Sequence, residues 1–172
     1  RKIGIMIETI LEILKQSDAD DYKIISSKTV SNEFFFVQHK LDMNRKKEVE
    51  HIQLTVYKKI DHDSYLGSSS CEIHPTMSRE EVESAIKNLC ISASYVKNPI
   101  YTLNGSNHKE MAGRKAVDAK KAAQDIIATV KSCNESENEK INSYEVFVNE
   151  KEIRIINSQG VDVSYSNMDS MC

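Results

Sequence analysis

The first residues of the chain predict a helix with one strongly apolar face. Apolar residues recur there at the i, i+4, i+7 and i+8 spacing of a helical stripe. Ile5, Met6 and Ile13 widen the stripe, so we expect the helix to be buried on more than one side. The polar residues 17–21 end it. The stripe itself consists of Ile3, Ile7, Ile10, Leu11 and Leu14.

A change to β-branched and aromatic residues then predicts four strands. Ser31 and Asn32 separate the first two, and the basic residues 44–47 are interpreted as a solvated turn. Ile52, Leu54 and Val56 alternate with polar residues, as in a strand with one buried face. Residues 61–63 form the next turn. The four predicted strands are residues 22–30, 33–41, 49–60 and 65–73.

Two further helices are expected. Ser78 with Glu81 three residues later is a capping box, in which each side chain satisfies an unpaired amide at a helix start. Apolar residues then follow a helical spacing, with Pro75 marking the approach. The third helix has an alanine-rich face. The apolar positions are Val82, Ala85, Ile86, Leu89, Cys90 and Ala93 in one helix, and Ala119, Ala122, Ala123, Ile126, Ile127 and Val130 in the other.

The last segment is rich in strand signals and predicts a three-stranded meander. Apolar and polar residues alternate around Val146, Ile155 and Val163. Residues 149–152 suit a hairpin turn between the first two strands. Residues 158–160 suit a second turn, in which Gly160 supplies the positive φ that such turns often need.

The order of elements predicts an α+β fold with a mixed, largely antiparallel sheet or sheets flanked by three helices. We expect an N-terminal α/β domain at residues 1–98 and a linker or loop at residues 99–114, where Pro, Gly and polar residues gather. A second α/β segment follows at residues 115–172. The chain begins at Arg1 without a Met and stops soon after a strand, so we expect this segment to be truncated at its C-terminus.

Composition narrows the class of protein but assigns no function. The 172 residues hold 23 basic and 26 acidic side chains, so the formal net charge of −3 argues against a nucleic-acid partner. The longest apolar runs are three or four residues, well below the roughly 20 that a membrane span requires. We therefore expect a soluble globular protein with no membrane partner.

The four cysteines point to free thiols rather than to a metal site. Cys71, Cys90, Cys133 and Cys172 form no Cys-x-x-Cys pair, the spacing that zinc knuckles and dithiol redox sites need. We expect reduced thiols and a cytoplasmic location. Cys71 and Cys90 fall on apolar faces, as small buried hydrophobic residues do.

The histidines show no ligand spacing. None of them is followed by Glu or has a second His three or four residues away, as the helical zinc motif requires. Residues 61–63 (Asp-His-Asp) are interpreted as a solvated turn, because neighbours on an extended chain point to opposite sides. The loop residues 108–110 are an equally weak candidate. The five histidines are His39, His51, His62, His74 and His108.

No nucleophile or phosphate loop is apparent either. The serines at residues 68–70 have no base placed beside them by sequence, and Cys71 and Cys133 are inert by default. Phe34, Phe35 and Phe36 would alternate faces in a strand, so core packing explains them better than base stacking. We therefore assign this chain no catalytic residue and no metal ligand, and its substrate-binding residues stay unknown.

Several stretches together resemble the N-terminal portion of the TldD/PmbA family, also called modulators of DNA gyrase. They are residues 52–57, 67–70, 78–81, 141–149 and 154–165, and the likeness covers most of residues 1–166. Its most specific part is the Asn-Ser-x-Gly turn at residues 157–160. The strand at residues 54–57 lacks the Gly-rich, Arg-containing sequence that the family has there, and it is more similar to the PmbA-type branch.

The resemblance implies a zinc-dependent peptidase system acting on small or unfolded peptides, built as a homo- or heterodimer of related subunits. The metal site of the family lies on a helix and a later Cys, beyond residue 172, so no cofactor is expected in this chain. We expect a scaffold that encloses substrate, with a peptide lying along an exposed sheet edge such as residues 142–149 or 161–166.

Two alternatives stay open. The first is the metal-free partner subunit of such a peptidase, which is similar throughout but lacks the ligands. The second is a free-standing, non-enzymatic interaction or sensor domain with the same order of strands and helices. The coding sequence after Cys172 discriminates among these readings.

Overall fold

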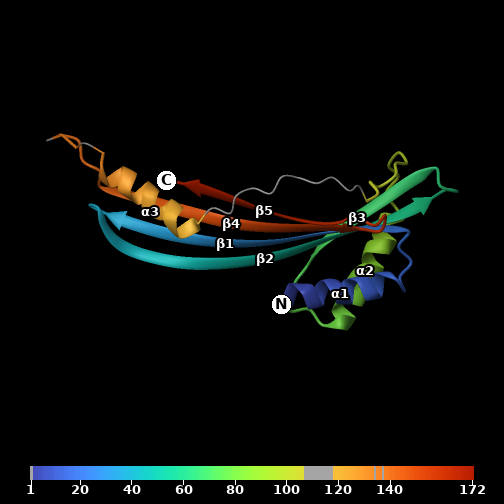
Figure 1. The fold of residues 1–172 in the computed structure, drawn as a ribbon. Coiled ribbons are helices and arrows are strands. Elements are labelled where there is room, and N and C mark those ends of the chain that lie inside the picture. Colours follow the sequence, from blue (N-terminus) through green and yellow to red (C-terminus); the bar gives the residue numbers. More distant parts are fainter. Residues whose placement is uncertain (1, 107–117, 134, 137) are drawn as a thin grey trace. The chain divides into compact units, whose positions relative to one another are not determined.

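The computed structural model describes residues 2–106, 118–133, 135–136 and 138–172, and these form one five-stranded antiparallel sheet with three helices. The order of strands in the sheet is β3-β2-β1-β4-β5. The expected α+β fold is confirmed. The elements are α1 (Lys2–Leu14), β1 (Asp21–Val37), β2 (Lys40–Ile60), β3 (Tyr65–Ile73), α2 (Arg79–Ala93), α3 (Ala119–Lys131), β4 (Ser143–Asn157) and β5 (Asp162–Met171), labelled in Figure 1.

Three predicted turns are wrong, because they lie inside long strands. Ser31 and Asn32 are part of β1, residues 44–47 are part of β2, and residues 149–152 are part of β4. The predicted meander is therefore two strands, β4 and β5. Polar residues alternate between the two faces of a strand, and a sheet with one open face accepts them without a turn.

Two of the turns that do occur, at residues 38–39 and 61–63, use left-handed backbone at residues other than glycine. The tip between β1 and β2 has φ of 48° at Gln38 and 63° at His39. The predicted turn at residues 61–63 is confirmed, with φ between 53° and 64°. Gly160 has φ of 85°, as predicted for its turn. Such backbone is uncommon for non-glycine residues, which is why the β1–β2 tip carries little sequence signal.

The chain divides into two compact units, each of which is described by itself. Of the described residues, unit 1 takes in 2–27, 50–106 and 153–165, and unit 2 takes in the others. Strands β1, β2, β4 and β5 each contribute residues to both units. The division predicted at residues 99–114 stays a prediction, because residues 107–114 lie outside the described part.

Unit 1 has a dense aliphatic core. Helices α1 and α2 pack against one another, and α2 packs on β3 (Figure 1). Ile10, Ile52, Leu54 and Val82 are completely buried. The predicted capping box is confirmed: Ser78 Oγ accepts a hydrogen bond from Glu81 N, and Ser78 N donates to Glu81 Oε2 at 2.7 Å.

The end of α2 lies very close to β3 at Gly67. A Cβ atom at this position would lie 1.9 Å from Ala93 O and 2.6 Å from Val96 O. Only glycine allows this approach between two backbone segments.

Unit 2 has a much smaller core. Val146 and Val148 from β4 are completely buried beneath α3, whose one buried residue is Ala123. Phe34 and Ile126 are among the half-buried residues packed against them. As predicted for α3, its alanines face the sheet: Ala119 and Ala122 pack with Ala123 against the two valines. Within the described part of the chain, no helix has the length and apolar character that crossing a bilayer would require.

Candidate functional site

Among the residues that the structure describes, the histidines are paired with carboxylates or lie in or beside turns, and they do not converge on one site. His39 Nε2 lies 2.7 Å from Glu135 Oε1, and His51 Nδ1 lies 2.5 Å from Glu72 Oε1. The hydrogen bond to His39 lowers the pKa of Glu135. Across the described residues, no group of three or more His, Cys, Asp and Glu side chains is placed to hold a metal ion.

The other candidate histidines that the structure describes lie at the ends of strands or in loops. His62 is in the confirmed turn after β2 and is exposed, and His74 lies just after β3. The candidate at residues 108–110 lies outside the described residues.

The four cysteines are free thiols. Burial raises the pKa of Cys71 and of Cys90, which favours the protonated, unreactive form. Cys90 is in the core of unit 1 and Cys71 packs against that core, as predicted. Cys133 and Cys172 are exposed.

The aromatic and serine runs have structural partners. Phe34 and Phe36 lie toward α3, whereas Phe35 makes an edge-to-face contact with Phe147 at 5.8 Å between ring centroids. The predicted alternation of faces is therefore confirmed. The hydroxyl of Ser70 forms a 2.8 Å hydrogen bond with that of Thr55 on the adjacent strand.

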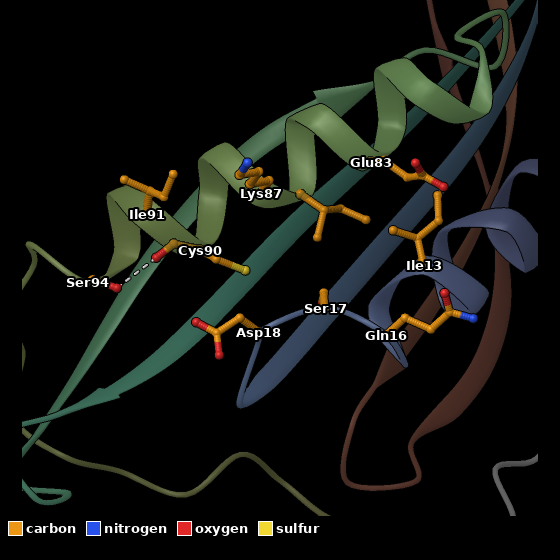
Figure 2. A pocket seen from close by; sticks show the side chains of 10 residues that line it. Ile13, Gln16, Ser17, Asp18, Glu83, Lys87, Cys90, Ile91 and Ser94 are labelled. Atoms are coloured by element: carbon orange, nitrogen blue, oxygen red, sulfur yellow. Dashed lines mark hydrogen bonds between the residues drawn. The ribbon is translucent and has the colours of Figure 1, made fainter.

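A pocket of about 520 Å³ lies between the end of α1 and the length of α2 in unit 1. Figure 2 shows Ile13 and Cys90 pointing into it from the two helices, with Asp18 and Gln16 on the segment after α1. The lining residues are Ile13, Gln16, Ser17, Asp18, Glu83, Ile86, Lys87, Cys90, Ile91 and Ser94. The volume is within the range of small-molecule sites.

Asp18 and Glu83, the two acidic residues that line this pocket, already have partners. Lys58 Nζ lies 3.1 Å from Asp18 Oδ2 and 3.3 Å from Asp20 Oδ2. Burial disfavours the charge on Lys58, but the hydrogen bonds and charges of the two aspartates outweigh it and raise the lysine pKa. Glu83 accepts a hydrogen bond from Arg79 at 3.1 Å. The pocket thus combines an apolar wall of Ile13, Ile86 and Ile91 with polar residues, and its one thiol, Cys90, has a pKa raised by burial.

The Asn-Ser-x-Gly turn at residues 157–160 connects β4 to β5 and is bonded to the start of β1. Asn157 Oδ1 accepts hydrogen bonds from the N–H groups of Gln159 at 2.9 Å and Val161 at 3.1 Å. Ser158 Oγ donates to Asp21 Oδ1, and Gln159 Nε2 donates to the same oxygen at 2.7 Å. These bonds attach the turn to the start of β1, so its side chains serve the fold.

The sheet has two edge strands, β3 and β5. The predicted edge at residues 142–149 is wrong, because β4 is hydrogen-bonded between β1 and β5. The predicted edge at residues 161–166 is confirmed, since β5 covers nearly all of it. Edge strands present backbone N–H and C=O groups to a further strand. Sequence alone could not separate these cases, because strand order depends on long-range pairing.

Solved structures share this fold, whereas no family model and no curated protein sequence matches the chain. TldE from Thermococcus kodakarensis has a TM-score of 0.61 at 16% identity over 99% of this chain. A candidate modulator of DNA gyrase from Thermotoga maritima has a TM-score of 0.61 at 14% identity over 98%. Another from Bacteroides thetaiotaomicron has a TM-score of 0.56 at 19% identity over 94%.

The chain has the fold of the N-terminal portion of these proteins. The resemblance to the TldD/PmbA family that the sequence indicated is thereby confirmed at the level of the fold. This chain spans 38% of the length of each of the three neighbours. At these identities the TldD/PmbA likeness concerns architecture alone.

Proposed function

We propose that this chain is the non-catalytic N-terminal region of a TldD/PmbA-type zinc-dependent peptidase. One observation carries the proposal: nearly the whole chain matches the fold of an N-terminal portion, 38% of the length, of neighbours from three organisms. The described residues do not fit a zinc site, because no metal-ligand group is assembled among them. Zinc-dependent hydrolysis would therefore be performed by residues other than these.

The role proposed for the chain is to confine an extended peptide. The edge strand β5 offers main-chain groups to such a peptide, and Val163 and Tyr165 on it are 46% and 52% exposed. A strand added to an edge gains affinity from main-chain hydrogen bonds and specificity from alternate side chains. Hydrogen exchange tests this step: added protection on peptide binding should concentrate at residues 162–171.

The chain is also proposed to contact a related subunit, in a homo- or heterodimer in the cytoplasm. Large exposed side chains near the end of α2 in unit 1 support this part. Tyr95 is 83% exposed and Tyr101 is 51% exposed, and aromatic residues are enriched at protein interfaces.

Metal analysis and peptide cleavage by the purified 172-residue chain test the proposal. We expect no stoichiometric zinc and no chelator-sensitive cleavage of peptides. Tight binding of one zinc ion per chain, or cleavage that a chelator abolishes, would show that the site lies in this chain.

Sequencing the gene after Cys172 separates the alternatives. A continuation with His-Glu-x-x-x-His and a later Cys supports an active peptidase. One of similar length without these residues supports the metal-free partner subunit. A stop codon there contradicts the proposal and supports an interaction domain.

A further inference from the structure

Unit 2 carries a polar hollow of about 420 Å³ on the open face of its sheet. Phe34 packs toward α3, so the alternate positions Ser31 and Glu33 of the same strand lie on the opposite face. All four strands of this unit contribute to the hollow. Its lining residues are Thr29, Ser31, Glu33, Lys47, Val49, Asn149, Lys151 and Asp169.

Both acidic groups of this hollow already have partners. The side chain of Glu33 is only 7% exposed, and one of its carboxylate oxygens accepts a hydrogen bond from Arg45 Nε. Asp169 Oδ1 accepts a hydrogen bond from Asn149 Nδ2 at 2.7 Å. A buried carboxylate requires such compensation, so these pairs hold the two acidic groups in place.

The hydrogen-bond donors of the hollow, by contrast, are largely unused. Lys47 and Lys151 are exposed, and neither has an ion-pair partner among the residues that the structure describes. In that same part of the chain, the hydroxyls of Thr29 and Ser31 have no hydrogen-bond partner, although Ser31 is only 9% exposed. Two ammonium groups and two hydroxyls therefore converge on one space from β1, β2 and β4.

The charge balance of the hollow favours a singly charged anion. Lys47, Lys151 and the adjacent Arg45 supply three positive charges, against two negative charges on Glu33 and Asp169. A phosphate dianion would bring two charges against these carboxylates, whereas a carboxylate brings one. Lysine also binds anions as a point charge and needs no planar, bidentate geometry.

We propose that this hollow binds a carboxylate group, with the two lysines as charge partners and the two hydroxyls as donors. The source is either the C-terminus of a peptide or a small free carboxylate, and Val49 offers the carrier an apolar contact. The inference goes beyond the peptidase assignment and does not depend on it. Binding is measured on this chain alone, so the two can fail separately.

Titration followed by amide NMR tests the site with three probes at constant ionic strength: acetyl-Ala-Ala-Val with a free C-terminus, its C-terminal amide, and acetate. We expect the free-acid peptide, and not the amide, to shift resonances of residues 29–33, 47–49 and 149–151. Stronger binding of the peptide than of acetate assigns the peptide source, and equal binding assigns a small carboxylate. No shift with either carboxylate overturns the proposal.

Matched lysine variants separate this site from general charge attraction. Lys47→Gln and Lys151→Gln should each weaken binding about tenfold, as expected for loss of a charged hydrogen bond. Lys46→Gln changes the adjacent exposed position of β2, which lies on the other face, and should change the affinity less than about twofold. Circular dichroism checks that each variant is folded.

Two results would contradict the carboxylate assignment. An equal loss of affinity in all three variants would indicate attraction to net charge rather than a built site. Tighter binding of inorganic phosphate than of either carboxylate, at the same ionic strength, would assign the hollow to a phosphate group.

Discussion

The two units use the same kinds of element but bury very different amounts of apolar side chain. Among the described residues, unit 1 has a cluster of fifteen buried residues from both helices and four strands, whereas the cluster of unit 2 has three. Unit 2 relies in addition on aromatic pairs, such as Phe36 stacked on Tyr144 at 4.5 Å between ring centroids. Because apolar burial is the main source of stability, unit 1 should be the more resistant to unfolding.

The comparison also separates two kinds of candidate site. The pocket of unit 1 lies between helices and is lined by the edge of the aliphatic core, including Ile13 and Ile86. The hollow of unit 2 lies on an open sheet face and is lined mainly by polar side chains. A small core thus leaves strand positions available for polar groups, and the sheet holds them in register.

The largest effect is expected from a cavity in the core of unit 1. Leu54 is completely buried, so Leu54→Ala should lower the free energy of unfolding by about 4 kcal/mol. Urea denaturation measures the change. Leu41→Ala in unit 2 is the control, because that side chain is 52% exposed and should cost less than about 0.5 kcal/mol. Equal effects would contradict the comparison.

A second effect comes from the close approach at Gly67. Gly67→Ala would place a methyl group 1.9 Å from a backbone oxygen of α2, and we expect a loss of roughly 3 kcal/mol. Gly4→Ala is the matched control, since nothing lies within 4 Å of a Cβ atom there. That variant should gain about 0.5–1 kcal/mol from helix propensity. Thermal unfolding of the two variants measures both changes, and an equal effect at the two positions would contradict the requirement for glycine at residue 67.

Helix caps give a smaller effect, which should be similar in size in the two units but different in how far the helix opens. Asp118 Oδ1 accepts hydrogen bonds from Lys120 N at 2.9 Å and Lys121 N at 3.2 Å. Asp118→Ala and Ser78→Ala should each cost about 1 kcal/mol.

Because α3 buries only Ala123, we expect the loss of Asp118 to open α3 locally, while α2 stays protected after the loss of Ser78. Hydrogen exchange along each helix tells these outcomes apart. Asp118→Asn is the control, because it retains an oxygen at the cap. If α2 opened as readily as α3, the difference in buried side chains would not explain which helix opens.

The sequence predicted the helices better than the strands, for a physical reason. A helix is identified by local spacing and caps, and the Ser78 capping box and the stripe of α1 are both present. Strand boundaries depend on partners far along the chain, so polar residues such as Ser31 resembled a turn although they lie inside β1. The tip at His39 was missed, because it uses positive φ without glycine.

No short sequence motif marks either the pocket of unit 1 or the hollow of unit 2. The pocket of unit 1 needs the packing of α1 against α2, and the hollow of unit 2 needs the register of four strands. Lys47 and Lys151 are about a hundred positions apart in sequence, and only the sheet brings them together. The only hint in the sequence is that Lys47 and Lys151 each occupy a strand position on the face opposite to the apolar core.

The smallest effect is a pH dependence confined to unit 2. The hydrogen bond to His39 and the N–H of Ile141 lower the pKa of Glu135 below its ordinary value of 4.5. A carboxylate with a lowered folded pKa contributes its full stabilisation above the ordinary value, and loses it as the pH falls through the folded pKa. The tip between β1 and β2, where Gln38 N donates to Asn142 O at 2.8 Å, should therefore open more readily in acid.

Hydrogen-exchange protection at Gln38, corrected for the intrinsic exchange rate, should fall as the pH drops below about 4.5 in the unmodified protein. Glu135→Gln should show lower protection near neutral pH and no further acid loss at this amide. Amides of Ile52 and Leu54 in the core of unit 1 serve as the reference, and should keep their protection across this range. A parallel loss at those amides would indicate acid unfolding of the whole protein rather than release of the tip. Since Glu135 is on a loop after α3, release confined to the tip would also show that polar pairs stabilise unit 2 where its apolar core ends.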